Sequence, residues 1–292
     1  MSVRRLSTRP KLARMYAGAM TGIGARRGRD LPDVTYELAD VAVDRDHLTR
    51  YNEVCGFRQA DVLPLTYPHL LAFPLAVALM TQGTFPFRLP GLIHVANRIT
   101  QHRALSADEH LTLQVHAANL REHPRGRQFD MVAEASVDGA AAWTSSSTYL
   151  HKEATDGNRA PRREPEGAPR PKREPEAAPR PTAIWRVPAS IGRRYAGVSG
   201  DVNPIHLHPL TARVFGFRRA IAHGMWVKAR CLAAMEGRLP EKVTVEVEFK
   251  SPLLLPSTVG FSAQPLEAGW SIALFTLRDG RPHLAGRIRN AG

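Results

Sequence analysis

The sequence predicts an α+β protein of two similar halves, each an antiparallel sheet wrapped round one central helix, with a disordered segment between them. One observation behind this prediction is an order of elements, namely a strand, an apolar helix and several further strands, that occurs twice along the 292 residues. A second is a proline-rich stretch near the middle, which divides the two series. A third is a short sequence match between the halves at a constant spacing.

Residues 1–33 form a predicted basic N-terminal tail. Eight lysine and arginine residues precede the first acid, Asp30, and they are not joined by the continuous apolar run of a secretory signal. With only Cys55 and Cys231 in the chain, we expect no disulfide framework and a reducing compartment. These features predict a cytoplasmic protein, and the same composition is compatible with an organellar transit peptide.

Residues 34–152 form the first predicted half. A strand at Val34–Arg45 precedes the most apolar run of the chain, Leu63–Gln82, which we interpret as a long central helix. That run is almost long enough to span a bilayer. It also contains Tyr67, His69, Pro68 and Pro74, which favour a buried helix of a soluble protein instead. Four antiparallel strands are predicted to follow, at Ile93–Arg103, His110–Leu120, Gln128–Val137 and Ala140–Leu150.

Residues 153–182 form a predicted linker between the halves. Arg163–Pro171 and Arg173–Pro181 are near-identical copies of a segment rich in proline, glutamate and arginine. Proline and charge at this density cannot build a hydrophobic core, so we expect an extended and largely disordered spacer. A ligand for a proline-recognising domain is the alternative interpretation.

Residues 183–292 repeat the order of the first half. A short strand is predicted at Ala183–Val187 and a helix at Ala220–Glu236, which Gly237 ends. Lys242–Lys250 then alternates apolar and polar residues, the pattern of a strand with one buried face and one exposed face. The remaining predicted strands are Thr258–Gln264, Trp270–Leu277 and His283–Ile288.

Tyr195–His206 is the stretch in which residues suited to chemistry gather. Asp201 and His206 lie close together in the sequence, and Pro204 between them prevents a regular helix from running through both. An irregular turn can direct a carboxylate and an imidazole to one point, as general acid–base catalysis requires. Ala222–Trp226 follows, with a glycine that opens the predicted helix. An ordinary Ser-Gly-Asp turn with an unrelated histidine is the alternative.

Nine residues of this stretch carry a resemblance to a known family: Tyr195, Val198, Ser199, Gly200, Asp201, Asn203, Pro204, Ile205 and His206. Together they resemble the signature of the MaoC-like (R)-specific enoyl-CoA hydratases, the hydratase-2 family. Ala222-His223-Gly224-Met225 is similar to the next segment of that family. The resemblance covers residues 183–292 well and the first half weakly. It implies a double-hotdog fold in which Asp201 and His206 are the catalytic pair and the N–H of Gly224 binds the thioester oxygen.

Three neighbouring residues are predicted to support the pair. Asn203 orients the neighbouring carboxylate or, by preference, caps the turn. Ser199 bonds a backbone group, since no base lies beside it to make it a nucleophile, and His223 fixes the start of the helix. His206 and His208 lack a third ligand at metal-binding spacing, so no metal is predicted.

The first half contains a degenerate copy of the same stretch. Tyr51, Val54 and Gly56 match a tyrosine, a valine and a glycine of the second half at one offset. At that offset Phe57 stands in the place of the aspartate and Val62 in that of the histidine. An apolar copy is free to hold an apolar ligand, so Phe57 and Val62 are predicted to line an acyl-chain cavity. The resemblance implies the same division into a catalytic half and a non-catalytic half.

The formal net charge of +13 suits a polyanionic partner. The phosphates of coenzyme A and an acidic acyl carrier protein fit the resemblance, and a solubilising bias in composition is equally compatible. The sequence shows neither basic–aromatic interleaving nor a zinc-finger or helix-turn-helix signal, so no nucleic-acid partner is expected. No transmembrane segment and no cofactor beyond the thioester carrier is predicted. The two halves would form a pseudo-dimer, and a further homodimer is left open.

The sequence therefore predicts a 3-hydroxyacyl-thioester dehydratase or (R)-specific enoyl-CoA hydratase of fatty-acid metabolism, which is a hydro-lyase. The main alternative is a non-catalytic acyl-thioester-binding subunit of a lipid-synthesis complex, and the intact pair of Asp201 and His206 argues against it. A hotdog thioesterase is a second alternative, and the Asn203-Pro204 sequence argues against that one.

Overall fold

A computed structural model describes residues 2–12, 15–16, 18, 28–153 and 180–291 of the chain. The first half runs β2 (Val34–Val41), α2 (Arg45–Cys55), α3 (Tyr67–Met80), β3 (Leu92–Gln101), β4 (Leu111–His123), β5 (Gly126–Val137) and β6 (Ala140–Lys152). The second half runs β7 (Ala183–Val187), α4 (Ile191–Ser199), α5 (Pro204–Leu207), α6 (Pro209–Val214), α7 (Gly224–Ala233), β8 (Val243–Phe249), β9 (Ser257–Leu266), β10 (Gly269–Thr276) and β11 (Pro282–Asn290). The predicted α+β class is confirmed.

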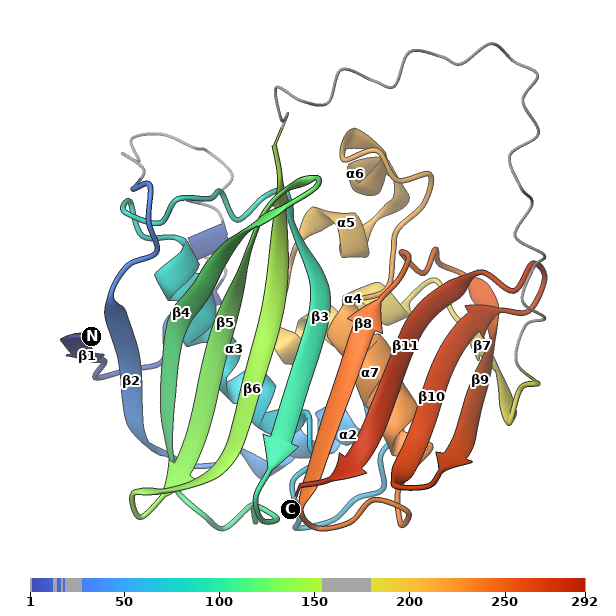
Figure 1. The fold of residues 1–292 in the computed structure, drawn as a ribbon, viewed down its shortest axis with the longest axis horizontal. Helices are drawn as coiled ribbons and strands as arrows, with labels where there is room; N and C mark the ends of the chain where they lie inside the picture. Colours follow the sequence, from blue (N-terminus) through green and yellow to red (C-terminus); the bar gives the residue numbers. More distant parts are fainter. Residues whose placement is uncertain (1, 13–14, 17, 19–27, 154–179, 292) are drawn as a thin grey trace.

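The strands form one continuous sheet of eleven strands, in the order β1-β2-β4-β5-β6-β3-β8-β11-β10-β9-β7 (Figure 1). The prediction of two separate sheets is therefore wrong. β3 of the first half pairs antiparallel with β8 of the second, from Ala96 opposite Glu248 to Gln101 opposite Val243. Each of these strands ends its own half of the sheet, and a free edge would leave backbone N–H and C=O groups unpaired. Pairing the two edges satisfies both sets of groups.

The two halves have the same order of strands, and they differ in that α5 and α6 of the second half have no counterpart in the first. From the outer edge to the seam, the first half reads β2-β4-β5-β6-β3 and the second reads β7-β9-β10-β11-β8. α2 and α4 each end at a glycine in the left-handed region, with φ 81° at Gly56 and φ 70° at Gly200, where a side chain would be strained. Of the predicted linker, residues 153–182, the segment 154–179 lies outside the described residues.

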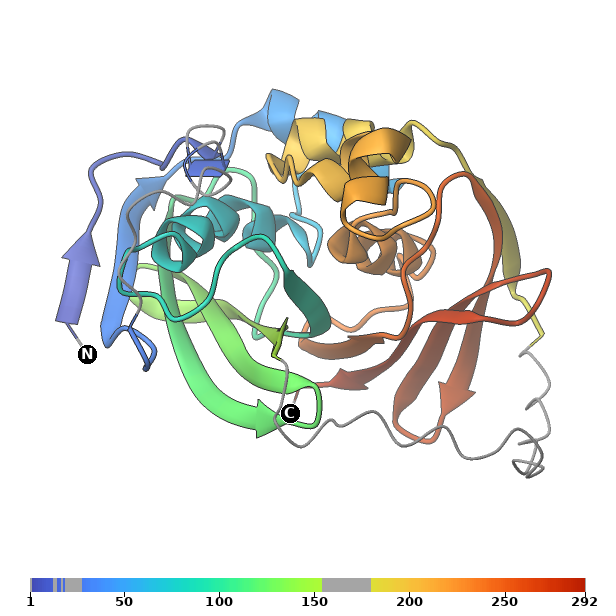
Figure 2. The same cartoon turned by 90° about the horizontal axis from the view of Figure 1, so that it is seen from above.

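The central helices of the two halves are α3 and α7. Figure 2 shows the sheet curving round them, with α2 and α4 on the side away from the sheet. α3 begins at Tyr67, later than the predicted helix. Pro68 lies in the first turn, where backbone N–H groups have no acceptor within the helix, so the proline costs no hydrogen bond there. α7 begins at Gly224 because the preceding backbone is extended: His223 has φ −66° and ψ 137°, and Ala222 donates its N–H to the carbonyl oxygen of Leu253. Within the described residues, no helix has both the length and the apolar character needed to cross a bilayer.

The described part of the predicted N-terminal tail is bound to the fold. β1 (Ser2–Arg5) pairs in parallel with β2, with Ser2 opposite Val34. Farther along, Arg9 donates from Nη2 to the carbonyl oxygen of Leu70 at 2.9 Å. Leu12 packs against Gly200, because a Cβ at that glycine would lie 2.4 Å from Leu12 Cδ1. We call residues 2–12 and 15–16 the N-terminal strap, since they run from the sheet edge to the end of α4.

Candidate active site

Asp201 lies in the loop that follows α4. The left-handed Gly200 turns the chain out of the helix, and Ser199 Oγ accepts the Asp201 N–H at 3.2 Å. Oδ1 of Asp201 in turn accepts the N–H of Asn203 at 3.3 Å. Asn203 caps the short helix α5 by accepting the Ile205 N–H at 3.3 Å. Local hydrogen bonds from the predicted supporting residues therefore fix the path of the loop and the direction of the carboxylate.

His206 is buried and lies on the short helix α5, so the predicted irregular turn holds Asp201 but ends before His206. Its Nδ1 is 2.8 Å from the carbonyl oxygen of Ile221. Since a carbonyl only accepts, Nδ1 carries the proton and Nε2 of the neutral ring is a free acceptor. The backbone of α5 is held directly by α4, because a Cβ at Gly192 would lie 2.0 Å from the His206 carbonyl oxygen.

His223 is the N-cap residue of α7 and lies against both members of the pair. Its ring stacks on that of His206, with centroids 3.6 Å apart and an interplanar angle of 25°. Its Nε2 is 3.0 Å from the backbone oxygen of Asp201 and 3.8 Å from Oδ2 of the same residue. Nε2 therefore donates to the backbone oxygen and ties the Asp201 loop to the start of the central helix. The buried Nδ1 has no partner among the described residues.

The charges of this cluster differ from residue to residue. Burial alone would raise the pKa of Asp201, but the imidazoles of His223 and His206 and the hydrogen bond from Tyr16 together lower it. Burial lowers the pKa of His206, although Asp201 acts in the opposite direction. Burial and the neighbouring His206 lower the pKa of His223 to about 3. At neutral pH the site therefore contains one carboxylate and two neutral imidazoles.

The donor set is better suited to proton transfer than to binding a metal. One nitrogen or oxygen atom from each of Asp201, His206 and His223 lies within 4.8 Å of the others, which is a spacing that metal centres use. Nε2 of His223 already donates a proton to a carbonyl, however, and Nδ1 of His206 does the same. The lone pairs that remain are those of Asp201 Oδ2, His206 Nε2 and His223 Nδ1, and the last of these is fully buried. Two donors can therefore be reached from the cavity, fewer than the three protein ligands of a typical catalytic zinc site.

Gly224 is the first residue of α7, so its N–H has no acceptor within the helix. The positive end of the helix dipole favours developing negative charge at this position. A Cβ here would lie 3.1 Å from the ring of Phe249. The glycine therefore allows an aromatic side chain to lie directly over the helix start. The residue predicted to bind the thioester oxygen is thus close to the pair, with a free donor.

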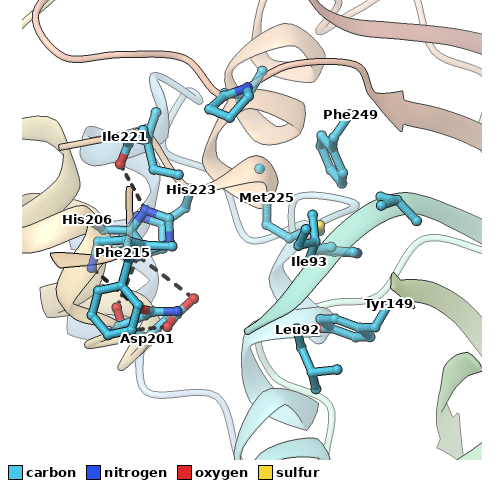
Figure 3. A pocket seen from close by; sticks show the side chains of 18 of the residues that line it. Leu92, Ile93, Tyr149, Asp201, His206, Phe215, Ile221, His223, Met225 and Phe249 are labelled. Carbon is cyan, nitrogen blue, oxygen red and sulfur yellow. Dashed lines mark hydrogen bonds and ion pairs between the residues drawn. The ribbon is translucent and has the colours of Figure 1, made fainter. Parts of the chain in front are cut away.

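A cavity of about 520 Å³ connects these groups, and both halves of the chain line it. In Figure 3 Asp201, His206 and His223 lie on one side of it, and Leu92, Ile93 and Tyr149 lie on the other. The first half also contributes His69, Leu70, Phe73 and Met80 from α3, and the second contributes Phe215, Phe217 and Phe249. Its volume is in the range of small-molecule sites.

Two residues predicted to line the cavity do not. Phe57 and Val62 both belong to the described part of the chain, and neither is among the cavity residues. Val62 is 54% exposed, and the ring of Phe57 lies 6.1 Å from that of Tyr51. The reason is the length of the connection: residues 57–66 join α2 to α3, whereas residues 201–223 join α4 to α7. One fixed offset therefore fails to align the two halves beyond the left-handed glycines.

Sequence reasoning missed Tyr16. Its hydroxyl donates to Oδ1 of Asp201 at 2.7 Å, and its side chain lines the cavity. No motif surrounds Tyr16 in the sequence, and the composition of the neighbouring residues suggested a tail. A tyrosine within an otherwise basic segment is too common to indicate such a contact.

The fold and the site together define a double-hotdog protein whose cavity carries an Asp–His pair beside the first N–H of a central helix. The model of the MaoC-like domain matches residues 166–269. The 3-hydroxyacyl-thioester dehydratase X of Mycobacterium tuberculosis is 38% identical over 278 residues, 95% of this chain and 96% of that protein. A crystal structure of the M. tuberculosis protein HtdX has a TM-score of 0.76 and 36% identity, covering 88% of this chain and 99% of its own.

A more distant neighbour supports the architecture alone. It is an M. tuberculosis protein described as having a double hotdog fold, with a TM-score of 0.51 and 14% identity over 86% of this chain and 93% of its own. The identity to dehydratase X over nearly the whole of both chains is decisive. The chain belongs to the MaoC-like dehydratase family.

Proposed function

We propose that this protein is a 3-hydroxyacyl-thioester dehydratase, a hydro-lyase that also catalyses the reverse, (R)-specific hydration of an enoyl thioester. The observation that carries the proposal is a pair of free acceptors, Oδ2 of Asp201 and Nε2 of His206, beside the N–H of Gly224 in one cavity. The near full-length similarity to dehydratase X supports the same reaction class.

The two acceptors match the two protons of a water molecule. In the hydration direction, a water that donates one proton to Asp201 and one to His206 directs a lone pair at the β-carbon. One proton then passes from water through the pair to the α-carbon. In the dehydration direction the pair removes the α-proton, the β-carbon–oxygen bond breaks, and the same proton leaves with the hydroxyl as water. Acid–base assistance of this kind contributes about 10²–10⁴ in rate.

Gly224 and its helix supply the third requirement of the reaction. Negative charge develops on the thioester oxygen while the α-carbon gains or loses its proton. We assign the Gly224 N–H to that oxygen, because it is an unpaired donor at the positive end of α7. Loss of one such donor typically costs about 10²–10³ in rate.

The carrier part of the substrate has cationic neighbours in the same cavity. Arg125, Lys152 and Lys250 are all among its lining residues. Coenzyme A and the phosphopantetheine arm of an acyl carrier protein both present phosphate groups, which these cations attract. We therefore propose a coenzyme A or acyl-carrier-protein thioester as substrate, with an acidic carrier protein favoured by the net charge of +13.

The acyl part has an apolar wall, which the first half provides. Leu70, Phe73 and Met80 of α3 and Leu92 of β3 line the cavity, and burying a hydrocarbon chain against them is favourable. The first half, residues 34–152, is thus assigned to acyl binding and the second half, residues 183–292, to catalysis. The buried free thiols of Cys55 and Cys231 fit the proposed cytoplasmic location.

The test is an absorbance assay on the purified full-length chain. The conjugated enoyl thioester absorbs in the ultraviolet, so hydration of short-chain and long-chain enoyl-CoA should remove this band, and Asp201→Asn should abolish the change. Release of free thiol is followed in parallel. Loss of the band without thiol release supports the dehydratase. Thiol release would identify a thioesterase instead, and binding with an unchanged band would identify a non-catalytic subunit.

A further inference from the structure

The hydroxyl of Tyr16 is the group of the N-terminal strap that reaches the candidate active site. It donates to Oδ1 of Asp201 at 2.7 Å from within the same cavity. Burial, and next the negative charge of Asp201, raise the pKa of Tyr16. The hydroxyl therefore keeps its proton and serves as a donor at neutral pH.

We propose that Tyr16 is a positioning residue of the dehydratase reaction, which holds Oδ1 of Asp201 so that Oδ2 alone faces the reacting hydroxyl or water. This inference rests on the function proposed above for Asp201. Oδ1 receives two donors, the Tyr16 hydroxyl and the Asn203 N–H at 3.3 Å. Oδ2 has Nε2 of His223 at 3.8 Å, which is too long for a hydrogen bond.

The asymmetry between the two carboxylate oxygens is what gives the contact its role. A carboxylate held by a short hydrogen bond from an O–H group does not exchange its two oxygens by rotation, because rotation breaks that bond. Oδ1 is thereby saturated and Oδ2 keeps its lone pairs for substrate. Without Tyr16 only the longer backbone bond would orient the group, and both oxygens would compete for the substrate hydroxyl.

The N-terminal strap, which carries Tyr16, is anchored to the first half of the molecule. Leu6 donates its N–H to Glu37 of β2 at 2.8 Å, next to the parallel pairing of β1 with β2. Arg9 then binds the Leu70 carbonyl of α3, and Leu12 packs on Gly200 at the end of α4. Tyr16 thus connects the edge of the non-catalytic half to the carboxylate of the catalytic half.

Other titratable groups also face Asp201. They are His69 of α3, His94 of β3, Tyr149 of β6, Tyr195 of α4, His206 of α5 and His223 at the start of α7. Within the described residues, Tyr16 is the side chain that donates a hydrogen bond to the carboxylate. That bond favours the charged form of Asp201 and lowers its pKa, against the effect of burial. Removing it should raise the pKa of this carboxyl group.

The experiment compares Tyr16→Phe with the wild type in the full-length chain. We measure kcat and KM for a 3-hydroxyacyl-CoA from about pH 4 to 9, so that the acidic end approaches the titration of the Asp201 carboxyl group. The hydrogen bond to a charged group predicts a fall in kcat of about 10- to 100-fold, with a smaller change in KM. It also predicts that the acidic limb of the kcat profile moves to higher pH.

Tyr36→Phe is the matched control, since it removes another tyrosine hydroxyl. Tyr36 is buried in β2, is bonded to Arg4 and Gln82, and lies outside the cavity residues. The control should retain both the kcat and the pH profile of the wild type. Equal losses in the two variants would overturn the proposal, because they would reflect general stability.

Two outcomes for Tyr16→Phe count against the positioning role. One is an unchanged kcat, and the other is a lower kcat with an unmoved acidic limb, which would mean that the ring only fills space. Carbon-13 NMR of the Asp201 carboxyl group gives a readout that does not need turnover: its pKa should be higher in Tyr16→Phe than in the wild type. An inactive wild type would therefore refute the proposed reaction while the Tyr16–Asp201 contact is still tested.

Discussion

The connection between α2 and α3 differs from its counterpart between α4 and α7. Both begin after a left-handed glycine, Gly56 or Gly200, at the end of an equivalent helix. In the first half residues 57–66 then lead to the central helix, and in the second half residues 201–223 do so. The longer connection contains Asp201, His206 and His223, together with α5 and α6.

This difference supports the proposed division of the two halves into one that catalyses and one that binds the acyl chain. The sheets and central helices of the two halves have the same topology, so the scaffold alone does not determine chemistry. The proposed catalytic side chains of the candidate site lie on the longer connection, between α4 and α7. The shorter connection leaves α3 with apolar residues toward the cavity, where they can bind an acyl chain. The predictions below test this division of roles.

The largest effect is expected at the pair itself. His206→Ala should lower kcat by about 10²–10⁴, because it removes the free acceptor Nε2. Asp201→Ala combined with His206→Ala should be little worse than either single variant, since both act on one proton path. Phe57 follows Gly56, the first-half counterpart of Gly200, and it lies outside the cavity residues. Phe57→Ala should therefore leave kcat unchanged. Steady-state kinetics and melting curves of the two single variants, the double variant and Phe57→Ala check this. Additive losses would mean that the two residues work separately.

The next largest effect is expected at the close backbone contact between α4 and α5. In Gly192→Ala the new Cβ would lie 2.0 Å from the His206 carbonyl oxygen, so α4 or α5 must move. We expect a loss of activity of about 10² and of stability of about 1–3 kcal/mol. Gly197→Ala in the same helix meets nothing within 4 Å and should stabilise by about 0.5–1 kcal/mol. Urea unfolding and kcat are the measurements, and similar behaviour of the two variants would contradict the role of this contact.

A milder change is expected at the start of α7. In Gly224→Ala the new methyl group lies 3.1 Å from the Phe249 ring, so the ring or the helix start must shift near the thioester oxygen. kcat should fall by about 10- to 100-fold, since the donor is displaced and not removed. Adding Phe249→Leu should recover part of the activity by making room. If the second change brings no recovery, the crowding argument is wrong.

The dependence of stability on pH involves histidines of both halves. Burial lowers the pKa of His206, and it lowers the pKa of His69 to about 4. Burial and the neighbouring His69 lower the pKa of His94 to about 3. Below about pH 6.5 the unfolded chain therefore binds protons that the folded chain does not, and stability falls as the pH falls. Each such histidine contributes a slope of about 1.4 kcal/mol per pH unit. Urea titrations from pH 7.5 to 5 should show a shallower slope for His206→Gln than for the wild type.

The smallest effect is expected at Val62, which the sequence match wrongly aligned with His206. Val62 is 54% exposed, so Val62→Ser should change stability by less than about 0.5 kcal/mol and leave the preference for acyl-chain length unaltered. Phe73 of α3 lines the cavity, and Phe73→Ala should raise kcat/KM for long chains relative to short ones by enlarging it. The measurement for both variants is the ratio of kcat/KM for a long-chain substrate to kcat/KM for a short-chain substrate. An altered ratio in Val62→Ser would mean that the short connection also binds substrate.

The sequence predicted those parts of the site that depend on neighbouring residues. Asp201, His206 and Gly224 occur within two short stretches, so their residue types and spacing could be recognised together. The strands from β2 to β11 were predicted to within a few residues because their apolar alternation is local. β1 was not predicted, since it lies in the segment taken for a basic tail. α2 and α4 were missed, although the Asp44 cap and the glycines that end both helices are present. α2 has four charged residues among eleven, and α4 is only nine residues long and contains two glycines, so neither has a strong apolar periodicity.

The remaining features depend on contacts between distant residues. The pairing of β3 with β8 joins two halves, and local pattern does not say which strand edges will meet. The bond from Tyr16 to Asp201 joins the N-terminal strap to the second half. The alignment of Val62 with His206 assumed equal connection lengths, and only the folded chain shows where α3 and α7 begin.

The seam between β3 and β8 has a consequence for how substrate enters and product leaves. Backbone hydrogen bonds join the halves along this seam, and residues of both strands, Ile93 and Phe249 among them, line the cavity. A clamshell motion that parts the halves would break this row of bonds and expose two strand edges to water. We therefore expect access to the cavity to depend on smaller movements, for example of Phe215, a cavity residue that is 38% exposed and lies on the connection that also carries His206.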